Sequence, residues 1–117
     1  MKLHSAVLYT SDIDAVEDFY NKKLGIEIEY RSGDKFISFM FPNGSRLGIK
    51  KAVEEREVPG KQTLFIEVDS VNEWYKKAQE FNLNILKQLT EESWATEFSV
   101  LDPDGNKVQI IQPNTNT

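Results

Sequence analysis

The chain has 117 residues, of which 39% are hydrophobic and 28% are charged, so one compact domain with its own core is expected. Its net charge of −5 without a cluster of Lys or Arg argues against nucleic-acid binding, and the lack of cysteine excludes disulfides, thiolate metal sites and a cysteine nucleophile. A membrane span of ~20 apolar residues and the apolar segment of a secretory signal are both missing, so a cytoplasmic protein without membrane contact is expected.

The chain begins with a predicted strand and a predicted helix. Residues 2–10 alternate as a strand, and Ser11 or Asp12 caps a helix whose first turns are acidic. Apolar residues recur at helical spacing up to Leu24 and predict a buried stripe. Gly25 is expected to end the helix in the left-handed conformation.

Three more strands and a linker complete the first half. The turn signals at residues 32–34 and at Pro42-Asn43-Gly44 separate the strands. The predicted strands cover residues 26–31, 35–41 and 45–51. Residues 52–61 are polar and include Pro59-Gly60, which predicts a linker. Its charges are expected to form a solvated loop, and a lid over a ligand is the second hypothesis.

The second half repeats this order. Asp69 or Ser70 caps a helix that extends to about Phe81, with Trp74 expected on its buried side. The predicted strands cover residues 63–68, 85–89, 95–101 and 107–112, with a loop at 90–94 and a polar tail at 113–117.

Two stretches of similar pattern indicate an internal repeat. The stretch 41–49 and the stretch 102–110 both read Pro, Asn or Asp, Gly, a polar and a basic residue, and then an apolar strand. Residues 7–13 align in the same way with 65–71. One domain, 1–117, is therefore predicted to hold two βαβββ units, at about 2–51 and about 62–112.

This pattern resembles the vicinal oxygen chelate superfamily, the glyoxalase/bleomycin resistance protein/dioxygenase family. The resemblance depends on three motifs: Tyr9-Thr10-Ser11-Asp12-Ile13, Phe19-Tyr20-x3-Leu24-Gly25 and Asp102-Pro103-Asp104-Gly105-Asn106-Lys107. It implies an α+β fold in which tandem βαβββ repeats form curved mixed sheets around a cavity. It also implies a homodimer, because dimers are frequent in the family.

The resemblance also implies where metal ligands would lie, on the first and fourth strands of each unit. Those positions are Ser5, Gly48, Thr63 and Gln109 in this chain. Gly48 has no side chain, the two hydroxyls are weak neutral donors, and Gln109 offers one carbonyl oxygen, whereas a divalent catalytic metal prefers imidazole or carboxylate. The expectation is therefore a protein without metal or other cofactor, with no catalytic residue assigned.

Two residues keep a metal-dependent alternative open. His4, the only histidine, lies one residue before the expected position and so on the opposite face of its strand. Glu67 shares a face with Thr63 and Phe65, as either a polar contact to a ligand or an exposed strand end. A divalent metal at displaced ligands is the alternative.

Residues that alternate along the strands with the four implied ligand positions point to the same face, and we expect them to line the cavity. Aromatic and neutral polar side chains predominate among them, which suits stacking with a few hydrogen bonds. The alternative is that these side chains pack together without leaving a cavity. The candidate ligand-binding residues are Ser5, Val7, Tyr9, Gly48, Thr63, Phe65, Glu67, Trp94, Gln109 and Ile111.

The function that this resemblance implies is metal-independent binding and sequestration of a small molecule, such as an antibiotic. The ligand is expected to be flat or amphipathic, and an acidic surface tolerates cationic ligands better than anionic ones. The alternatives are a metal-dependent lyase or isomerase of glyoxalase type, or a dioxygenase, and a regulatory module that has lost the pocket.

Overall fold

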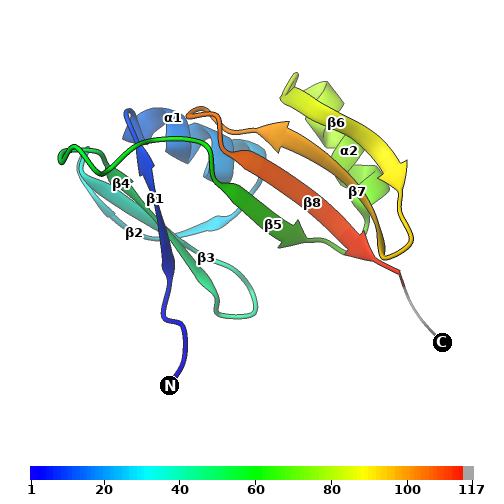
Figure 1. The fold of residues 1–117 in the computed structure, drawn as a ribbon, viewed down its shortest axis with the longest axis horizontal. Helices are drawn as coiled ribbons and strands as arrows, with labels where there is room; N and C mark the ends of the chain where they lie inside the picture. The colour runs from blue at the N-terminus through cyan, green and yellow to red at the C-terminus, as the bar shows by residue number, and fades with distance from the viewer. Residues whose placement is uncertain (115–117) are drawn as a thin grey trace. The chain divides into compact units, whose positions relative to one another are not determined.

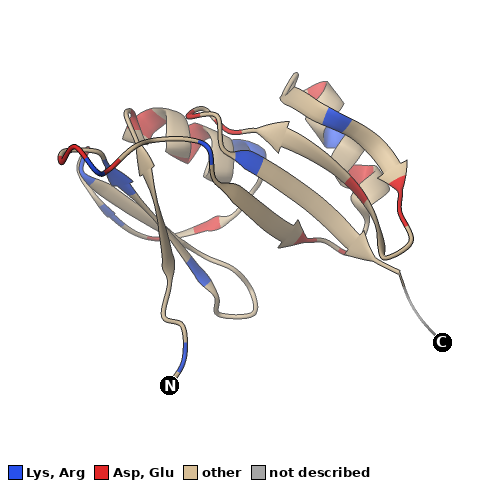
Figure 2. Cartoon of the chain, viewed as in Figure 1, with Lys and Arg blue, Asp and Glu red and all other residues tan. Residues whose placement is uncertain are grey.

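The computed structural model describes residues 1–114, and the predicted tail beyond Asn114 lies outside the described residues. The chain divides into two compact units, Met1–Gly60 and the part from Lys61 onward (Figure 1). Charged residues of both signs occur in both units (Figure 2). None of the helices in residues 1–114 has the length and apolarity that a membrane crossing needs.

The first unit is one four-stranded mixed sheet with a helical segment. Its strands lie in the order β1-β4-β3-β2, with β1 parallel to β4 and the other pairs antiparallel. The elements are β1 (Ala6–Thr10), α1 (Ile13–Glu17), η1 (Asp18–Lys23), β2 (Glu27–Ser32), β3 (Phe36–Met40) and β4 (Arg46–Lys51).

The second unit has the same topology. Its strands lie in the order β5-β8-β7-β6, with only β5 and β8 parallel. The elements are β5 (Thr63–Glu67), α2 (Val71–Glu80), β6 (Asn84–Glu91), β7 (Ala95–Leu101) and β8 (Lys107–Pro113). The α+β fold prediction with two mixed four-stranded sheets is confirmed, whereas a cavity enclosed by the sheets stays a prediction.

The first helix differs from its prediction, because its second half is the π-helix η1. Asp12 caps α1 by accepting a hydrogen bond from the Ala15 N–H at 3.3 Å. In a π-helix each N–H donates to the carbonyl oxygen five residues earlier, instead of four as in an α-helix. In η1 the adjacent residues Phe19 and Tyr20 are both buried. Gly25, at φ 72°, follows the end of this segment as predicted.

The second helix covers one face of its sheet. Ser70 caps α2, and Tyr75 contacts Phe98 of β7 with 5.1 Å between ring centroids. Trp74 is only half-buried, with Lys77 over its ring, and Phe81 is 45% exposed, so the predicted apolar side of this helix is narrower than expected. The opposite face of the sheet carries no helix of this unit.

Two strands differ from their predicted limits by more than one residue. Strand β1 begins at Ala6 rather than at residue 2, because pairing with β4 begins at Ala6 and Leu47. Strand β6 continues to Glu91, where a loop was predicted, because register shifts along β6 let Thr90 and Glu91 pair with β7.

Candidate functional site

The helix-free face of the second sheet carries a row of side chains in register. Phe65 of β5 lies opposite Gln109 of β8, Gln109 lies opposite Ser99 of β7, and Ser99 lies opposite Lys87 of β6. Paired residues of neighbouring strands point to the same face, and Phe98 points to the helix on the other face. The row therefore crosses the whole sheet on the side away from α2.

Glu97 is the centre of a polar cluster on this face. Its Oε1 accepts a hydrogen bond from Lys87 Nζ at 2.9 Å, and its Oε2 accepts one from Gln109 Nε2. Lys87 Nζ also donates to Glu92 at 3.0 Å. Glu97 is only 3% exposed, whereas the Lys87 side chain is 39% exposed, so only the carboxylate of this ion pair lies out of water.

The electrostatics of the cluster keep both partners ionised. Burial is the largest influence and would raise the pKa of Glu97, but the hydrogen bonds from Lys87 and Gln109 together lower it below its ordinary value. The hydrogen bonds to Glu97 and then to Glu92 raise the pKa of Lys87. The cluster is thus a fixed ion pair at neutral pH.

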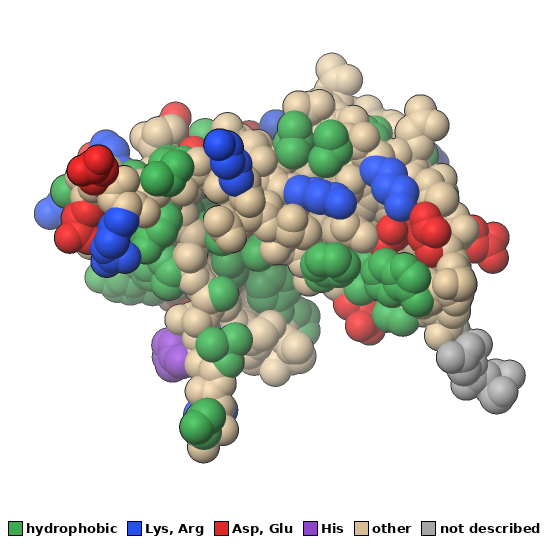
Figure 3. Space-filling model, viewed as in Figure 1, with side chains coloured by type: hydrophobic (Ala, Val, Ile, Leu, Met, Phe, Trp, Pro, Cys, Tyr) green, Lys and Arg blue, Asp and Glu red, His purple; other side chains and the backbone are tan. Residues whose placement is uncertain are grey.

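An exposed aromatic pair lies on the same face. The ring centroids of Phe65 and Trp94 are 6.4 Å apart, and the two residues are 60% and 48% exposed. Hydrophobic side chains gather where β5 and β8 lie, next to acidic ones (Figure 3). Large rings left in water beside a buried carboxylate are unusual for a face that serves only stability.

Ser99 adds an unsatisfied group within the polar cluster. Its side chain is fully buried, and its Oγ has no hydrogen-bond partner. It lies between Gln109 and Lys87 in the row described above. A buried hydroxyl without a partner is destabilising, so this part of the sheet is not arranged for stability alone.

The equivalent face of the first unit is apolar at its centre. The ring of Phe36 lies over Gly48, where an added Cβ would be 2.9 Å from Phe36 Cζ and 3.4 Å from Val7 Cγ2. Gly48 and Phe36 occupy the positions that Gln109 and Glu97 occupy in the second repeat. An aromatic ring thus replaces the carboxylate at this position, and the charged cluster of this unit is instead formed by Glu29, which accepts hydrogen bonds from Ser38 and Arg46.

Glu54, Glu55 and Arg56 of the linker are exposed, as predicted for a solvated loop, but Glu57 fastens the linker to the first unit. Glu57 is only 4% exposed, and both its carboxylate oxygens accept hydrogen bonds from Lys50 Nζ at 2.7 Å. Its Oε1 also accepts from the N–H groups of Val53 and Glu54. The hydrogen bond from Lys50, followed by those from the backbone, lowers the pKa of Glu57 to about 2.

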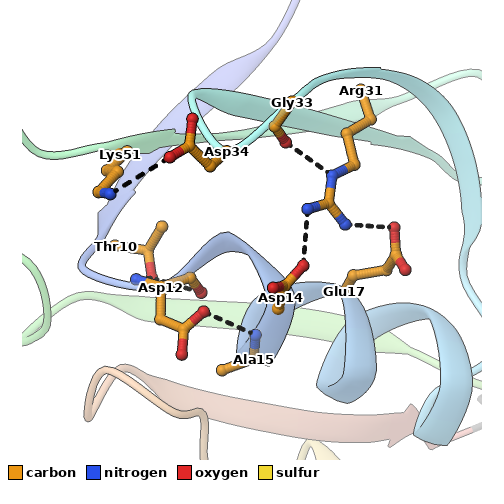
Figure 4. A network of polar contacts seen from close by, with 9 residues as sticks. All are labelled: Thr10, Asp12, Asp14, Ala15, Glu17, Arg31, Gly33, Asp34 and Lys51. Carbon is orange, nitrogen blue, oxygen red and sulfur yellow. Dashed lines mark hydrogen bonds and ion pairs between the residues drawn. The ribbon is translucent and has the colours of Figure 1, made fainter.

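A second charged network of the first unit is structural (Figure 4). Arg31 of β2 donates to Asp14 at 2.7 Å, to Glu17 at 2.9 Å and to the Gly33 carbonyl oxygen at 2.8 Å. Lys51 forms a longer ion pair with Asp34, at 3.6 Å. The Arg31 contacts hold α1 to the β2–β3 hairpin, and the Lys51 contact holds β4 to the same hairpin. We assign these contacts a structural role.

The predicted site residues fall into two groups, one for each unit. In the second unit Phe65, Trp94 and Gln109 lie around the polar cluster, and Ile111 lies opposite both Glu67 and Glu97. Thr63 begins β5 and is exposed. The members in the first unit are Ser5, Val7, Tyr9 and Gly48, of which Ser5 precedes β1 with its Oγ 3.3 Å from His4 Nδ1.

Sequence reasoning missed Glu97 and Lys87. Glu97 is the one charged residue in the apolar strand from Ala95 to Leu101, which is a signal that could have drawn attention to it. Lys87 carries no such signal, because its approach to Glu97 depends on the register shifts of β6.

The sequence profile of the Glyoxalase/Bleomycin resistance protein/Dioxygenase superfamily matches residues 2–110. The chain belongs to this superfamily. No curated protein matches the sequence closely enough to count as a relative. The superfamily assignment confirms the family predicted from the sequence motifs, although the metal-independent subtype stays a prediction.

Solved structures with the superfamily fold include both binding proteins and enzymes. An antibiotic-binding protein from Streptomyces sp. CB03234 is 19% identical, with 97% of each chain covered and a TM-score of 0.87. A lactoylglutathione lyase from Agrobacterium tumefaciens is 18% identical, with 95% of this chain and 92% of that chain covered and a TM-score of 0.79. A glyoxalase/dioxygenase from Nostoc punctiforme is also 18% identical, with 97% and 92% covered and a TM-score of 0.81.

The positions implied for a superfamily metal do not fit one. Gly48 provides no donor and has no room for a side chain under Phe36. The Gln109 amide nitrogen already donates to Glu97, and Lys87 occupies one carboxylate oxygen of Glu97. No cluster of three or more His, Cys, Asp or Glu side chains suited to a metal occurs in residues 1–114.

Proposed function

We propose that this protein is a metal-independent binding protein that sequesters a flat small molecule on the helix-free face of its second unit. One observation carries the proposal: the exposed Phe65–Trp94 pair lies beside the cluster of the buried Glu97 and Gln109 with the half-exposed Lys87. Rings give contact area for stacking, and a few fixed polar groups orient the ligand.

The donor types support binding over metal chemistry. Neither Thr63 nor Gln109 carries the imidazole or carboxylate that the enzymes' metal would require. The antibiotic-binding protein from Streptomyces sp. CB03234 supports an antibiotic as the kind of ligand, since it is similar to this chain in fold.

Fluorescence of Trp94 tests this function directly. The chain has two tryptophans, and Trp74→Phe leaves Trp94 as the only reporter. A neutral three-ring compound, 9-anthracenemethanol, is expected to quench Trp94 in a saturable way and to raise the Tm of the protein, because a ligand that binds only the folded state stabilises it.

The matched control is Trp94→Phe, which leaves Trp74 on α2. We expect its fluorescence to change little on adding the compound, and its affinity measured by calorimetry to fall several-fold because one stacking ring has been exchanged. An unchanged Tm and an unchanged Trp94 signal, repeated with charged three-ring compounds, would count against the proposed function.

A further inference from the structure

We infer that Glu97 selects the charge of the ligand, so that the second unit binds flat aromatic compounds that carry a protonated nitrogen. This inference depends on the proposed function, because it concerns the same face. Glu97 acts as the acceptor for the ligand nitrogen, while Lys87 and Gln109 position its carboxylate.

The carboxylate of Glu97 has lone pairs left for a further donor, at a residue that is 3% exposed. Lys87 donates to one of its oxygens and Gln109 to the other, whereas an ionised carboxylate offers about four lone-pair sites. Because both present partners hold it in place, little conformational entropy is lost when a ligand nitrogen adds a third hydrogen bond.

The aromatic pair places a ligand within reach of this carboxylate. Phe65 is the direct neighbour of Gln109 across β5 and β8, and Gln109 is bonded to Glu97. Trp94 is three residues before Glu97 in the chain and contacts the Phe65 ring. A flat ligand stacked on these rings therefore has its edge next to the cluster, and a cation there also gains from the ring faces.

The charges on this face favour a cation over an anion. Glu67 and Glu97 both lie opposite Ile111, and Glu92 shares Lys87 with Glu97. Together with Lys87 and Lys107, these side chains have three negative and two positive charges. An anionic ligand would thus meet an excess of carboxylates, in a chain whose net charge is −5.

Ser99 provides a further sign that this face is not arranged for stability alone. Its buried Oγ lacks a partner and lies between Gln109 and Lys87. In the first unit the equivalent Ser38 donates to Glu29 at 3.3 Å, so that hydroxyl is satisfied within the protein. Of these two equivalent serines, only Ser99, in the second unit, has an unsatisfied hydroxyl.

Three probes of similar ring size test charge selection. They are 9-aminoacridine, a cation; 9-anthracenemethanol, which is neutral; and anthracene-9-carboxylate, an anion. In isothermal titration calorimetry with the wild-type protein, we expect the cation to bind at least about tenfold more tightly than the neutral probe, and the anion more weakly than both.

Two variants separate Glu97 from the general charge of the protein. Glu97→Gln is expected to weaken the cation about tenfold or more and to leave the neutral probe within a few-fold of wild type. Glu92→Gln is the control, because it also removes one negative charge and one partner of Lys87, at a residue that does not bond to Gln109. We expect it to change the cation affinity only about two- to threefold.

The outcomes distinguish this inference from the proposed function. Equal wild-type affinity for the cation and the neutral probe would overturn charge selection but leave the binding function in place, and this comparison needs no variant to fold. Equal losses in Glu97→Gln and Glu92→Gln would also overturn it, since net charge alone would then explain them. Failure of all three probes to bind the wild-type protein would overturn both.

Discussion

Gly48 and Gln109 occupy equivalent positions in the two repeats but have different surroundings. Gln109 donates a hydrogen bond to Glu97, whereas Gly48 lies beneath the Phe36 ring. The need for glycine at position 48 comes from the close approach of that ring, because the Gly48 backbone does not adopt a positive φ. The residue on the neighbouring strand, Phe36 on β3 or Glu97 on β7, thus determines which side chain fits at position 48 or 109.

Gly48→Ala should therefore destabilise the protein through overpacking. The new Cβ would lie 2.9 Å from Phe36 Cζ, and we expect the free energy of unfolding to fall by about 1–3 kcal/mol. Urea denaturation of the single variant and of Gly48→Ala combined with Phe36→Leu measures the effect. The second substitution should recover part of the loss, because it removes the ring atoms that the Cβ meets.

The control for this experiment is Gly44→Ala, in the turn before β4. Gly44 has φ 87° and no atom near its Cβ position, so its variant is destabilised by backbone strain alone. Phe36→Leu should not relieve that strain. If it relieves both variants equally, or if Gly48→Ala is as stable as the wild type, contact with Phe36 is not the reason for glycine at position 48.

Among the elements, the linker is the one whose role changed most between sequence and structure. Its charges predicted a solvated loop, and three of them are exposed, but Glu57 is buried and fixed by Lys50 of β4 and two backbone N–H groups. The contact that decides this is between residues seven positions apart, in a segment without periodicity. The linker thus continues the first unit, and the unit ends at Gly60.

The Glu57 contact should make stability depend on pH. Its pKa in the folded state is about 2, below its ordinary value of 4.5, so its contribution is fully present above the ordinary value and is lost as pH falls through the folded value. At about pH 7 we expect Glu57→Gln to lower the urea midpoint clearly. At about pH 3 the gap between variant and wild type should be smaller.

The control is Glu55→Gln, which removes a neighbouring exposed carboxylate of the linker. Its urea midpoint should stay close to that of the wild type at both pH values. A gap for Glu57→Gln that stays constant between the two pH values would show that the carboxylate charge of Glu57 does not stabilise the linker.

Local signals made most elements predictable, and non-local pairing limited the rest. The turns at Pro42-Asn43-Gly44 and Pro103-Asp104-Gly105 fix their hairpins through residues adjacent in sequence, so they could be found without a structure. The π-helix and the extension of β6 to Glu91 depend on packing and on register shifts against β7, which no short pattern encodes. Phe65 and Gln109 could be predicted from the repeat pattern. The Glu97–Lys87 pair could not, because it depends on the register shifts of β6.

At the scale of the whole molecule, the duplication has produced two units of equal topology and unequal surface chemistry. The helix-free face of the first unit is centred on Phe36 and Gly48, and that of the second on Glu97 and Gln109. We expect binding to depend on the second unit for this reason. The homodimer and the cytoplasmic location stay predictions from the sequence.

The donor chemistry of both units predicts that binding needs no metal. Soaking the untagged protein with nickel, zinc, manganese and ferrous ions, followed by dialysis and mass spectrometry, should give much less than one ion per chain. A chelator should leave the affinity for 9-anthracenemethanol unchanged. At the second unit an ion bound to Glu97 would lie beside the Lys87 ammonium group, which repels a divalent cation.

A built metal site provides the positive control for that experiment. The variant Thr63→His combined with Gln109→Glu places imidazole and carboxylate at the two superfamily positions of the second unit, with Glu97 as a nearby third ligand. We expect this variant to retain zinc where the wild type does not. One tight ion per chain in the wild type would contradict the prediction, and it would favour the metal-dependent lyase alternative over sequestration.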